Sequence, residues 1–186
     1  MPRRRSKSPE TPRKTDALRP LPSLQFMTFD QIRLRPVEPG DEVLLRRVYA
    51  STREEELRQA PWDDAMKEAF VRMQFDAQKS HYDRVYPECS NQVIEAAEGP
   101  AGRLYVDRSN KSVHIIDIAI LAEFRNRGIG GCILRELLRE AKESGVPATI
   151  HVERFNPAMR LYERLGFRKV KDAGEIYVLM EWRQEL

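Results

Sequence analysis

The sequence predicts a single α+β domain in which helices pack in layers on a central sheet of about seven strands. Three observations predict this class. The chain has 186 residues, 41% of them hydrophobic, which is enough to bury one substantial core. Segments that alternate apolar and polar residues, as strands do, are interspersed with segments that repeat apolar residues every three or four positions, as helices do. Their order is strand, two helices, three strands, helix, strand, helix and two strands, which indicates a layered α+β arrangement.

The first 24 residues differ in composition from the rest of the chain. They hold five of the twelve prolines, and residues 1–20 carry seven basic and two acidic groups. We therefore expect residues 1–24 to be a disordered basic tail and residues 25–186 to be the folded domain. The tail contributes +5 to a total charge of +3, which leaves the domain slightly acidic. Nucleic acid is therefore not an expected partner, although such a tail can act as a weak tether to an anionic surface.

Composition also bears on location and metal content. No apolar run approaches the roughly 18 to 20 residues of a membrane-spanning helix, and no apolar segment follows the initial charges as in a secretory signal. The two cysteines, Cys89 and Cys132, lie in unrelated contexts and form no metal-binding spacing. We expect a soluble, cytoplasmic protein without a bound metal.

The first half of the domain is expected to contain one strand and two helices. Residues 29–35 alternate as a strand that Pro36 closes, and Asp41 is placed to cap the first helix, which carries Val43, Leu44, Arg47 and Val48. A solvated helix face is expected at residues 53–56. A second helix is expected from Asp63 or Asp64 to about Lys79, with Trp62 as a staple before it. Its expected apolar face consists of Met66, Ala69, Phe70, Met73 and Ala77.

Three strands and a strongly amphipathic helix follow. The strands are expected at residues 92–96, 102–107 and 112–121, with hairpin connections at 98–100 and 108–111. The helix opens at Gly128 and ends at Ser144-Gly145, where Gly145 can adopt the left-handed conformation. Its apolar side is formed by Ile129, Ile133, Leu134, Leu137, Leu138 and Ala141.

The last part is expected to complete the sheet. A strand at 149–152 precedes a short helix that Asn156 caps, that Pro157 begins and that Gly166 ends. Strands are expected at 167–170 and 175–182. The last strand directs Ile176, Val178, Met180 and Trp182 to one side, an apolar face that could support a homodimer.

The junction between the strand at 115–120 and the helix at Gly128 is the clearest candidate site. The first turn of a helix leaves backbone N–H groups unpaired and carries about half a positive charge, so it suits a pyrophosphate. Glycine allows the phosphate to approach the backbone, and Arg125 and Arg127 add cations. The spacing excludes a nucleoside-triphosphate loop, a dinucleotide fingerprint and a protein kinase.

Two motifs give this site a specific resemblance. The segment Ile118-Ala119-Ile120-Leu121-Ala122-Glu123-Phe124-Arg125-Asn126-Arg127-Gly128-Ile129-Gly130-Gly131 resembles the acetyl-CoA-binding motif of the GNAT superfamily of N-acetyltransferases, whose core is [RQ]xxGxG. The segment Asn156-Pro157-Ala158-Met159-Arg160-Leu161-Tyr162-Glu163-Arg164-Leu165-Gly166-Phe167 resembles the second motif of that family. The resemblance covers about residues 28–182. It implies α/β/α layers and a mixed, mostly antiparallel sheet of about seven strands with about four helices, splayed at the strand that binds acetyl-CoA.

The resemblance also implies how the donor would be held. The backbone groups of Ile118 and Ile120 would bind the pantetheine arm, and the glycine-rich loop would bind the pyrophosphate. Asn156 would fix the neighbouring loop as a helix cap. The implied donor-binding residues are Ile118, Ile120, Arg125, Asn126, Arg127, Gly128, Ile129, Gly130, Gly131 and Asn156, with no metal.

In this family the acceptor amine attacks the thioester directly, in a ternary complex, without a covalent enzyme intermediate. Tyr162 would donate a proton to the departing thiolate, since a phenol of pKa about 10 can serve a thiol of pKa about 8.5. His151 lies where ribosomal-protein alanine acetyltransferases carry a catalytic Glu, and an imidazole of pKa near 6.5 suits a base. Glu153, Asp117, His114 or a water chain to solvent remain alternatives for this base.

Two other functions stay open at this stage. The chain could be a non-catalytic acyl-CoA-binding or regulatory module on the same fold, or a nucleic-acid-associated protein led by its basic tail. The acceptor is also open, because the first two helices carry no motif. A small amine, an amino acid, an antibiotic or a protein N-terminus would each fit an N-acetyltransferase.

Overall fold

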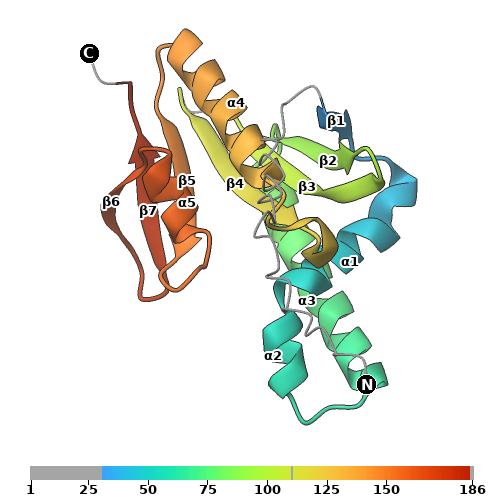
Figure 1. Cartoon of the computed structure of the whole chain (residues 1–186). Helices are drawn as coiled ribbons and strands as arrows, with labels where there is room; N and C mark the ends of the chain where they lie inside the picture. The colour runs from blue at the N-terminus through green and yellow to red at the C-terminus, as the bar shows by residue number, and fades with distance from the viewer. Residues whose placement is uncertain (1–30, 110, 185–186) are drawn as a thin grey trace, which may run out of the picture.

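The computed structural model describes residues 31–109 and 111–184, and within them a seven-stranded sheet with helices on both of its faces (Figure 1). The strand order is β1-β2-β3-β4-β5-β7-β6, antiparallel at every pair except the parallel pair β4–β5. The predicted fold class is therefore confirmed. The strands are β1 (Arg33–Pro36), β2 (Ser90–Ala96), β3 (Gly99–Asp107), β4 (Val113–Ile120), β5 (Ala148–Glu153), β6 (Arg168–Ala173) and β7 (Tyr177–Trp182).

Five α-helices lie in the described residues, one more than expected. They are α1 (Glu42–Thr52), α2 (Glu54–Gln59), α3 (Asp64–Val85), α4 (Ile129–Glu143) and α5 (Met159–Arg164), with short 3-10 turns η2 (Pro39–Asp41) and η3 (Ala122–Phe124). The additional helix, α2, is the solvated segment expected around residues 53–56, and it buries no side chain. None of the described helices is long and apolar enough to cross a membrane. The predicted tail, residues 1–24, lies outside the described residues.

Helix α4 follows its predicted pattern most closely. All six residues of the predicted apolar face are buried, and they join one cluster with Leu104, Val106 and Ile115 of the sheet. After the helix ends, Gly145 adopts φ 66°, and this left-handed conformation lets the chain turn back into β5. The 3.6-residue period of apolar residues predicted the buried face of α4 correctly, because α4 packs on the centre of the sheet.

The long helix α3 begins where expected but presents a different face. Asp63 caps it by accepting a hydrogen bond from the Met66 amide at 2.8 Å, and the helix ends at Val85, six residues beyond the expected Lys79. Met66 and Met73 are 57% and 58% exposed, and Ala69 and Ala77 are also exposed. The residues it buries are Val71 and Phe75, because α3 packs on the narrow surface that Leu45 and Tyr49 of α1 provide.

The segment before α3 also differs from expectation. Trp62 packs on Phe70 with ring centroids 5.0 Å apart, yet it remains 39% exposed and is not a core residue. In α1, Val43 points away from the core with 77% exposure, while Val48 is fully buried. The buried side of α1 consists of Leu45, Val48 and Tyr49.

The strands begin and end differently from the sequence expectation. Strand β1 starts at Arg33 and includes Pro36, which pairs with Gln92; the expected residues 29 and 30 lie outside the described part. The first hairpin turns at residues 97–98, so Gly99 and Pro100 belong to β3. Central strand β3 buries most of its length, whereas edge strand β6 exposes nearly all of its side chains.

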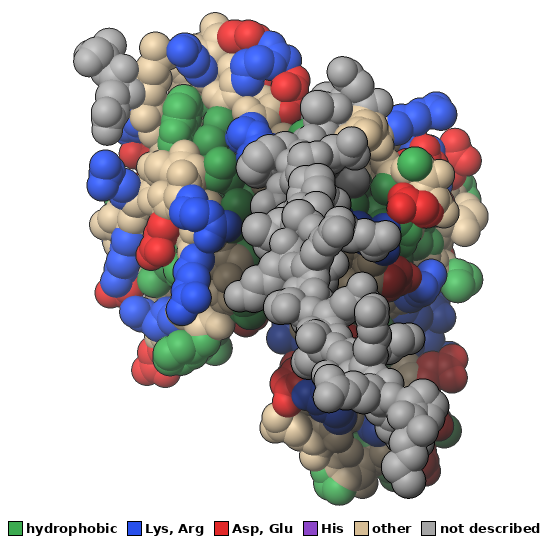
Figure 2. Space-filling view, viewed as in Figure 1, with side chains coloured by type: hydrophobic (Ala, Val, Ile, Leu, Met, Phe, Trp, Pro, Cys, Tyr) green, Lys and Arg blue, Asp and Glu red, His purple; other side chains and the backbone are tan. Residues whose placement is uncertain are grey.

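The C-terminal strands carry a strongly charged outer surface. Figure 2 shows Lys and Arg side chains spread over the side that carries β5, β6, β7 and α5. Charged side chains such as Lys169 and Lys171 on the edge strand β6 oppose pairing with another strand. Strand β7 is interior, and its Val178 and Met180 are 4% and 2% exposed in the chain's own core. Val178 and Met180 of the apolar face expected to support a homodimer are therefore already covered, whereas Ile176, which precedes the strand, is 62% exposed. The homodimer stays a prediction.

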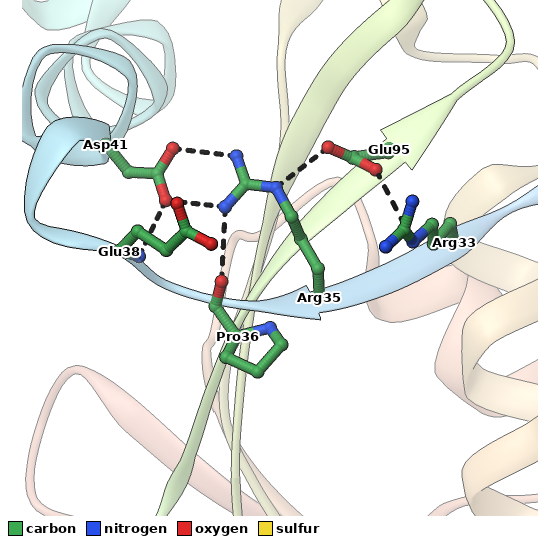
Figure 3. A network of polar contacts seen from close by, with 6 residues as sticks. All are labelled: Arg33, Arg35, Pro36, Glu38, Asp41 and Glu95. Carbon is green, nitrogen blue, oxygen red and sulfur yellow. Dashed lines mark hydrogen bonds and ion pairs between the residues drawn. The ribbon is translucent and has the colours of Figure 1, made fainter.

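A polar network joins β1 to the start of α1 (Figure 3). Asp41 precedes α1 as expected, but its carboxylate does not cap that helix. It accepts hydrogen bonds from both terminal nitrogens of Arg35, at 2.6 and 2.7 Å, and from the Glu38 amide at 2.8 Å. Arg35 also donates to Glu95 of β2 at 2.8 Å. The hydrogen bonds from Arg35 and from Glu38 lower the pKa of Asp41 from 3.8 to about 2.

We expect Asp41→Asn to lower the free energy of unfolding at pH 7 by about 1 kcal/mol, a value discounted for partial solvent screening. Because the folded-state pKa is lowered, the stabilisation is full above the ordinary pKa of 3.8 and is lost as the pH falls through about 2. Urea unfolding of both proteins between pH 2 and 7 measures this. Asp83→Asn, in an exposed pair with Lys79 inside α3, serves as control and should change stability by only a few tenths of a kcal/mol. A pH-independent loss at Asp41 would contradict the interpretation.

Candidate active site

The central feature of the site is the early separation of β4 from β5. The two strands pair only from Val113–Ala148 to Ile115–Ile150, and Figure 1 shows them diverging beyond that point. The Leu121 amide bonds to Ala101 of β3 at 2.9 Å. Because backbone groups alternate along a strand, those of Ile118 and Ile120 point toward the β5 side, where no strand of the described residues pairs with them. This is the splay that the sequence resemblance implied.

An irregularity in β4 coincides with the start of the splay. Val106 is paired with Ile115 and Tyr105 with Asp117, so Ile116 is an additional residue in β4. Such a bulge redirects the side chains beyond it. As a result Asp117 stands opposite Tyr105, on the sheet face that α3 covers, since Tyr105 packs on Tyr82 of α3 with centroids 5.5 Å apart.

The loop from β4 to α4 ends in a turn with two left-handed residues. Asn126 has φ 60° and Gly128 has φ 86°. The first helical bond of α4 runs from the Cys132 amide to the Gly128 carbonyl. The amides of Ile129, Gly130 and Gly131 precede that bond, so the helix itself gives them no acceptor.

Gly130 and Gly131 of this turn have room for a side chain within the protein itself. Among the described residues, a Cβ added at Gly130 would meet Leu161 at 3.9 Å, and one at Gly131 would meet Arg135 and Leu161 at 3.5 and 3.6 Å. These are ordinary contact distances, so internal packing does not require glycine at either position. Close approach of another molecule to these amides does require it, and an anion is the group that unpaired amides at a helix N-terminus favour.

The two arginines of the loop are held by the protein itself. Arg125 donates from Nε to the Ile120 carbonyl at 2.9 Å and from Nη2 to the carbonyl and hydroxyl of Ser51 in α1, at 2.8 and 2.7 Å. Arg127 pairs with Glu98 at 3.0 Å and lies over the Phe124 ring. Arg125 thus satisfies the Ile120 carbonyl and ties the loop to α1, a structural role that the motif alone did not indicate.

Tyr162 of α5 is nearly buried beside the splay. It is 5% exposed, and its ring meets Phe167 edge-on at 5.9 Å. Its hydroxyl makes no hydrogen bond to another residue in the described part of the chain. Burial, and then the negative charge of Asp117, raises the pKa of Tyr162 above its ordinary value. The phenol therefore keeps its proton at neutral pH and is a weaker acid than an exposed tyrosine.

His151 lies on β5 immediately after Ile150, the last residue paired with β4. Its ring meets that of His114 edge-on at 5.4 Å, and His114 shares a 2.8 Å hydrogen bond with Thr149. These contacts place His151 on the same sheet face as Asp117, on the opposite side of the splay. Burial, followed by the charge of Lys171, lowers the pKa of His151 below 6.5.

The remaining candidates occupy the rim of the site. Glu153 accepts a hydrogen bond from the Tyr177 hydroxyl at 3.3 Å and faces Arg53 at 3.9 Å. Asn156 does not cap α5 directly, since that helix begins at Met159. Its side chain accepts the Ala158 amide at 2.8 Å and so fixes the turn that leads into the helix. No group of three or more potential metal ligands is found in residues 31–109 and 111–184.

Sequence reasoning missed one residue of this region. Arg103 of β3 is 2% exposed and forms an ion pair with Asp117 at 2.7 Å. A cation inside a strand that is otherwise buried was the available signal, because a charged side chain is rarely fully buried unless it is paired. Its partner could not be inferred, since the pairing depends on the bulge at Ile116.

Comparison with known proteins identifies the family. The model of the Acetyltransferase (GNAT) family matches residues 47–167, which include β4, the glycine turn, α4 and α5. This chain belongs to that family. It is 31% identical over 77 residues, 41% of its length, to the Bacillus subtilis protein named "Uncharacterized N-acetyltransferase CgeE". It is 34% identical over 70 residues, 36% of its length, to an N-alpha-acetyltransferase of Sulfurisphaera tokodaii.

These sequence matches span 30% and 42% of the two relatives. The fold likeness extends further. The structure of the PaiA N-acetyltransferase from Thermoplasma acidophilum, solved in complex with coenzyme A, superimposes with a TM-score of 0.62 over 82% of this chain and 99% of that one. The identity is 17%, so the likeness shows a shared fold.

The pKa values of the paired histidines offer a test of the site geometry. We expect both imidazoles to titrate below 6.5 in NMR spectra, because burial disfavours the charged form of each. His151→Asn should raise the pKa of His114, since the His151 ring is the second cause of its lowering. Lys171→Gln is the matched control and should raise the pKa of His151 alone. A His114 titration unaffected by His151→Asn would contradict the placement of the two rings.

Proposed function

We propose that this protein transfers an acetyl group from acetyl-CoA to a primary amine. The observation that carries the proposal is the splay between β4 and β5, with the unpaired amides at the start of α4 at one end and the Tyr162 hydroxyl beside it. Membership in the acetyltransferase family and the likeness to a structure solved with coenzyme A support the same donor.

The residues present fit the donor. The amides of Ile129, Gly130 and Gly131 would bind the pyrophosphate, with Asn126 and Gly128 setting the turn and Arg125 and Arg127 holding its shape. The backbone groups of Ile118, and the amide of Ile120, would bind the amides of the pantetheine arm. Asn156 would act indirectly, by fixing the turn before α5. When bound, acetyl-CoA supplies an acetyl thioester.

Tyr162 and His151 would move the two protons of the reaction. The amine nitrogen forms a bond to the acetyl carbon, and the carbon–sulfur bond breaks. His151 takes one proton from the incoming ammonium, directly or through water, so that the neutral amine can attack. Tyr162 donates its proton to the departing sulfur, and the second proton, which the nitrogen loses on forming the amide, returns to Tyr162 through water. An alkylammonium of pKa about 10.4 is deprotonated only about once in 10³ molecules at pH 7, so a proton acceptor is needed. The lowered pKa keeps His151 neutral and able to accept at that pH.

The acceptor class can be narrowed. Similarity to a relative named an N-alpha-acetyltransferase favours an α-amino group of a peptide or protein among the acceptors that the sequence left open. The acceptor would approach over the sheet face that carries Asp117 and His151, where α3 and Glu153 form the borders.

Thiol release from acetyl-CoA tests the proposal directly. The purified full chain is mixed with acetyl-CoA and, in turn, the dipeptide Ala-Ala, 1,4-diaminobutane and tyramine. We expect release above the rate of hydrolysis with at least one of these amines, and mass spectrometry should show the acetylated amine. Binding of coenzyme A without turnover on any of them would contradict catalysis and favour a non-catalytic acyl-CoA-binding module.

Tyr162→Phe should lower kcat by about 10²- to 10⁴-fold, the usual range for loss of a positioned acid, while CoA affinity stays within about twofold. Steady-state kinetics and calorimetric titration with CoA measure the two quantities. Tyr86→Phe is the matched control, because Tyr86 packs on His114 at the edge of the sheet face that α3 covers. It should change kcat by less than about threefold. A Tyr162→Phe variant as fast as the parent would remove Tyr162 as the acid.

A further inference from the structure

The buried Arg103 of β3 forms an ion pair with Asp117, which lies just beyond the point where β4 and β5 separate. Its Nη2 lies 2.7 Å from Asp117 Oδ2 and donates a hydrogen bond to Gln78 Oε1 at 2.6 Å. Its guanidinium stands over the rings of Tyr49 and Tyr105, with centroid distances of 5.9 and 5.5 Å. The side chain is therefore held from α1, α3 and the sheet at once.

The two oxygens of Asp117 have different surroundings. Its Oδ2 is buried and lies 2.7 Å from Arg103 Nη2 as an ion pair, without hydrogen-bond geometry, whereas the side chain as a whole retains 20% exposure. Any exposure of the two carboxylate oxygens is therefore at Oδ1. The bulge at Ile116 directs this side chain to the face that α3 covers, at the level where β4 leaves β5.

The negative charge of Asp117 also acts on groups of the candidate site. Its negative charge contributes to the raised pKa of Tyr162 and to that of Tyr82, which borders the same face from α3. His151 stands across the splay from it. A carboxylate oxygen between a proton donor and a candidate base is placed to bind the nitrogen that reacts there.

Stability alone is a poor explanation for Arg103. Removing a guanidinium from water is costly, and a buried ion pair often stabilises a fold less than apolar side chains of the same volume would. Here neither the Nε of Arg103 nor the Oδ2 of Asp117 has a hydrogen-bond partner in the described part of the chain. The same pair does fix the orientation of one carboxylate at the edge of the candidate active site.

We propose that Arg103 is a positioning residue that holds Asp117 by Oδ2, so that Oδ1 accepts a hydrogen bond from the acceptor amine beside Tyr162. This inference rests on the proposed acetyl transfer and adds the residue that binds the acceptor nitrogen. Asp117 orients the amine, and His151 takes its proton. The acceptor is a primary amine that enters as the ammonium ion, the form a carboxylate binds best.

The test compares acceptor kinetics with donor binding in the full chain. With whichever of Ala-Ala, 1,4-diaminobutane and tyramine releases thiol fastest, Asp117→Asn should raise the acceptor KM at least tenfold. Arg103→Met should do the same. The double variant should be no worse than Asp117→Asn alone, because the two residues act as one unit. The Kd of CoA should stay within about twofold in all three, since neither side chain contacts the glycine turn.

Gln78→Met is the matched control. It removes the other partner of the same Arg103 nitrogen but leaves the ion pair with Asp117, so the acceptor KM should change less than about threefold. Arg103→Lys keeps a cation in the site without the planar fork of the guanidinium, and its acceptor KM should fall between those of the parent and Arg103→Met. If Arg103→Met does not fold, the acceptor KM values of Arg103→Lys and Asp117→Asn test the proposal instead.

The outcomes separate the two proposals. An acceptor KM within about twofold of the parent in Asp117→Asn or Arg103→Met overturns this inference and leaves the proposed function in place. Additive effects in the double variant overturn it as well, because independent residues would produce them. No thiol release by the parent with any of the three amines overturns the proposed function, and this inference with it.

Discussion

The separation of β4 from β5 is the constraint on which the rest of the structure depends. Parallel strands normally bury and satisfy their backbone groups on both sides. Here pairing stops at Ile115 and Ile150, which leaves the inner backbone groups of Ile118 and Ile120 without a neighbouring strand. A fold can keep such an opening only if other groups hold its two sides, and a ligand with amides of its own is suited to fill it.

Two arginines on opposite sides of β4 hold the opening in place. Arg125 donates a hydrogen bond to the Ile120 carbonyl and another to Ser51 of α1, which connects the glycine turn to that helix. Arg103 fixes Asp117 where the strand begins to diverge and links it to Gln78 of α3. Both use buried or constrained guanidinium groups to connect the N-terminal helices with the site. Helices α1 and α3, which carry no motif, thus contribute to its geometry.

The sequence predicted those parts of the molecule that depend on local patterns. The period of α4, the glycine turn and the fold class were confirmed because their signals lie within single segments. The buried face of α3 was wrong, since Val71 and Phe75 are selected by the shape of α1 and not by the distribution of apolar residues along α3. The roles of Asp41 and Arg103 could not be predicted either, because each depends on a partner from another element or on the bulge at Ile116. The roles assigned to Tyr162 and His151 stay predictions, although both lie beside the splay.

Amide hydrogen exchange with and without acetyl-CoA tests most directly whether the splay is the donor site. We expect saturating acetyl-CoA to slow exchange at Ile118, Ile120, Gly130 and Gly131, because these amides gain acceptors that the fold does not supply. Amides of the paired strands β1 and β2, remote from the opening, should exchange as before. Unchanged exchange at all four positions under saturation, with protection elsewhere, would contradict the account.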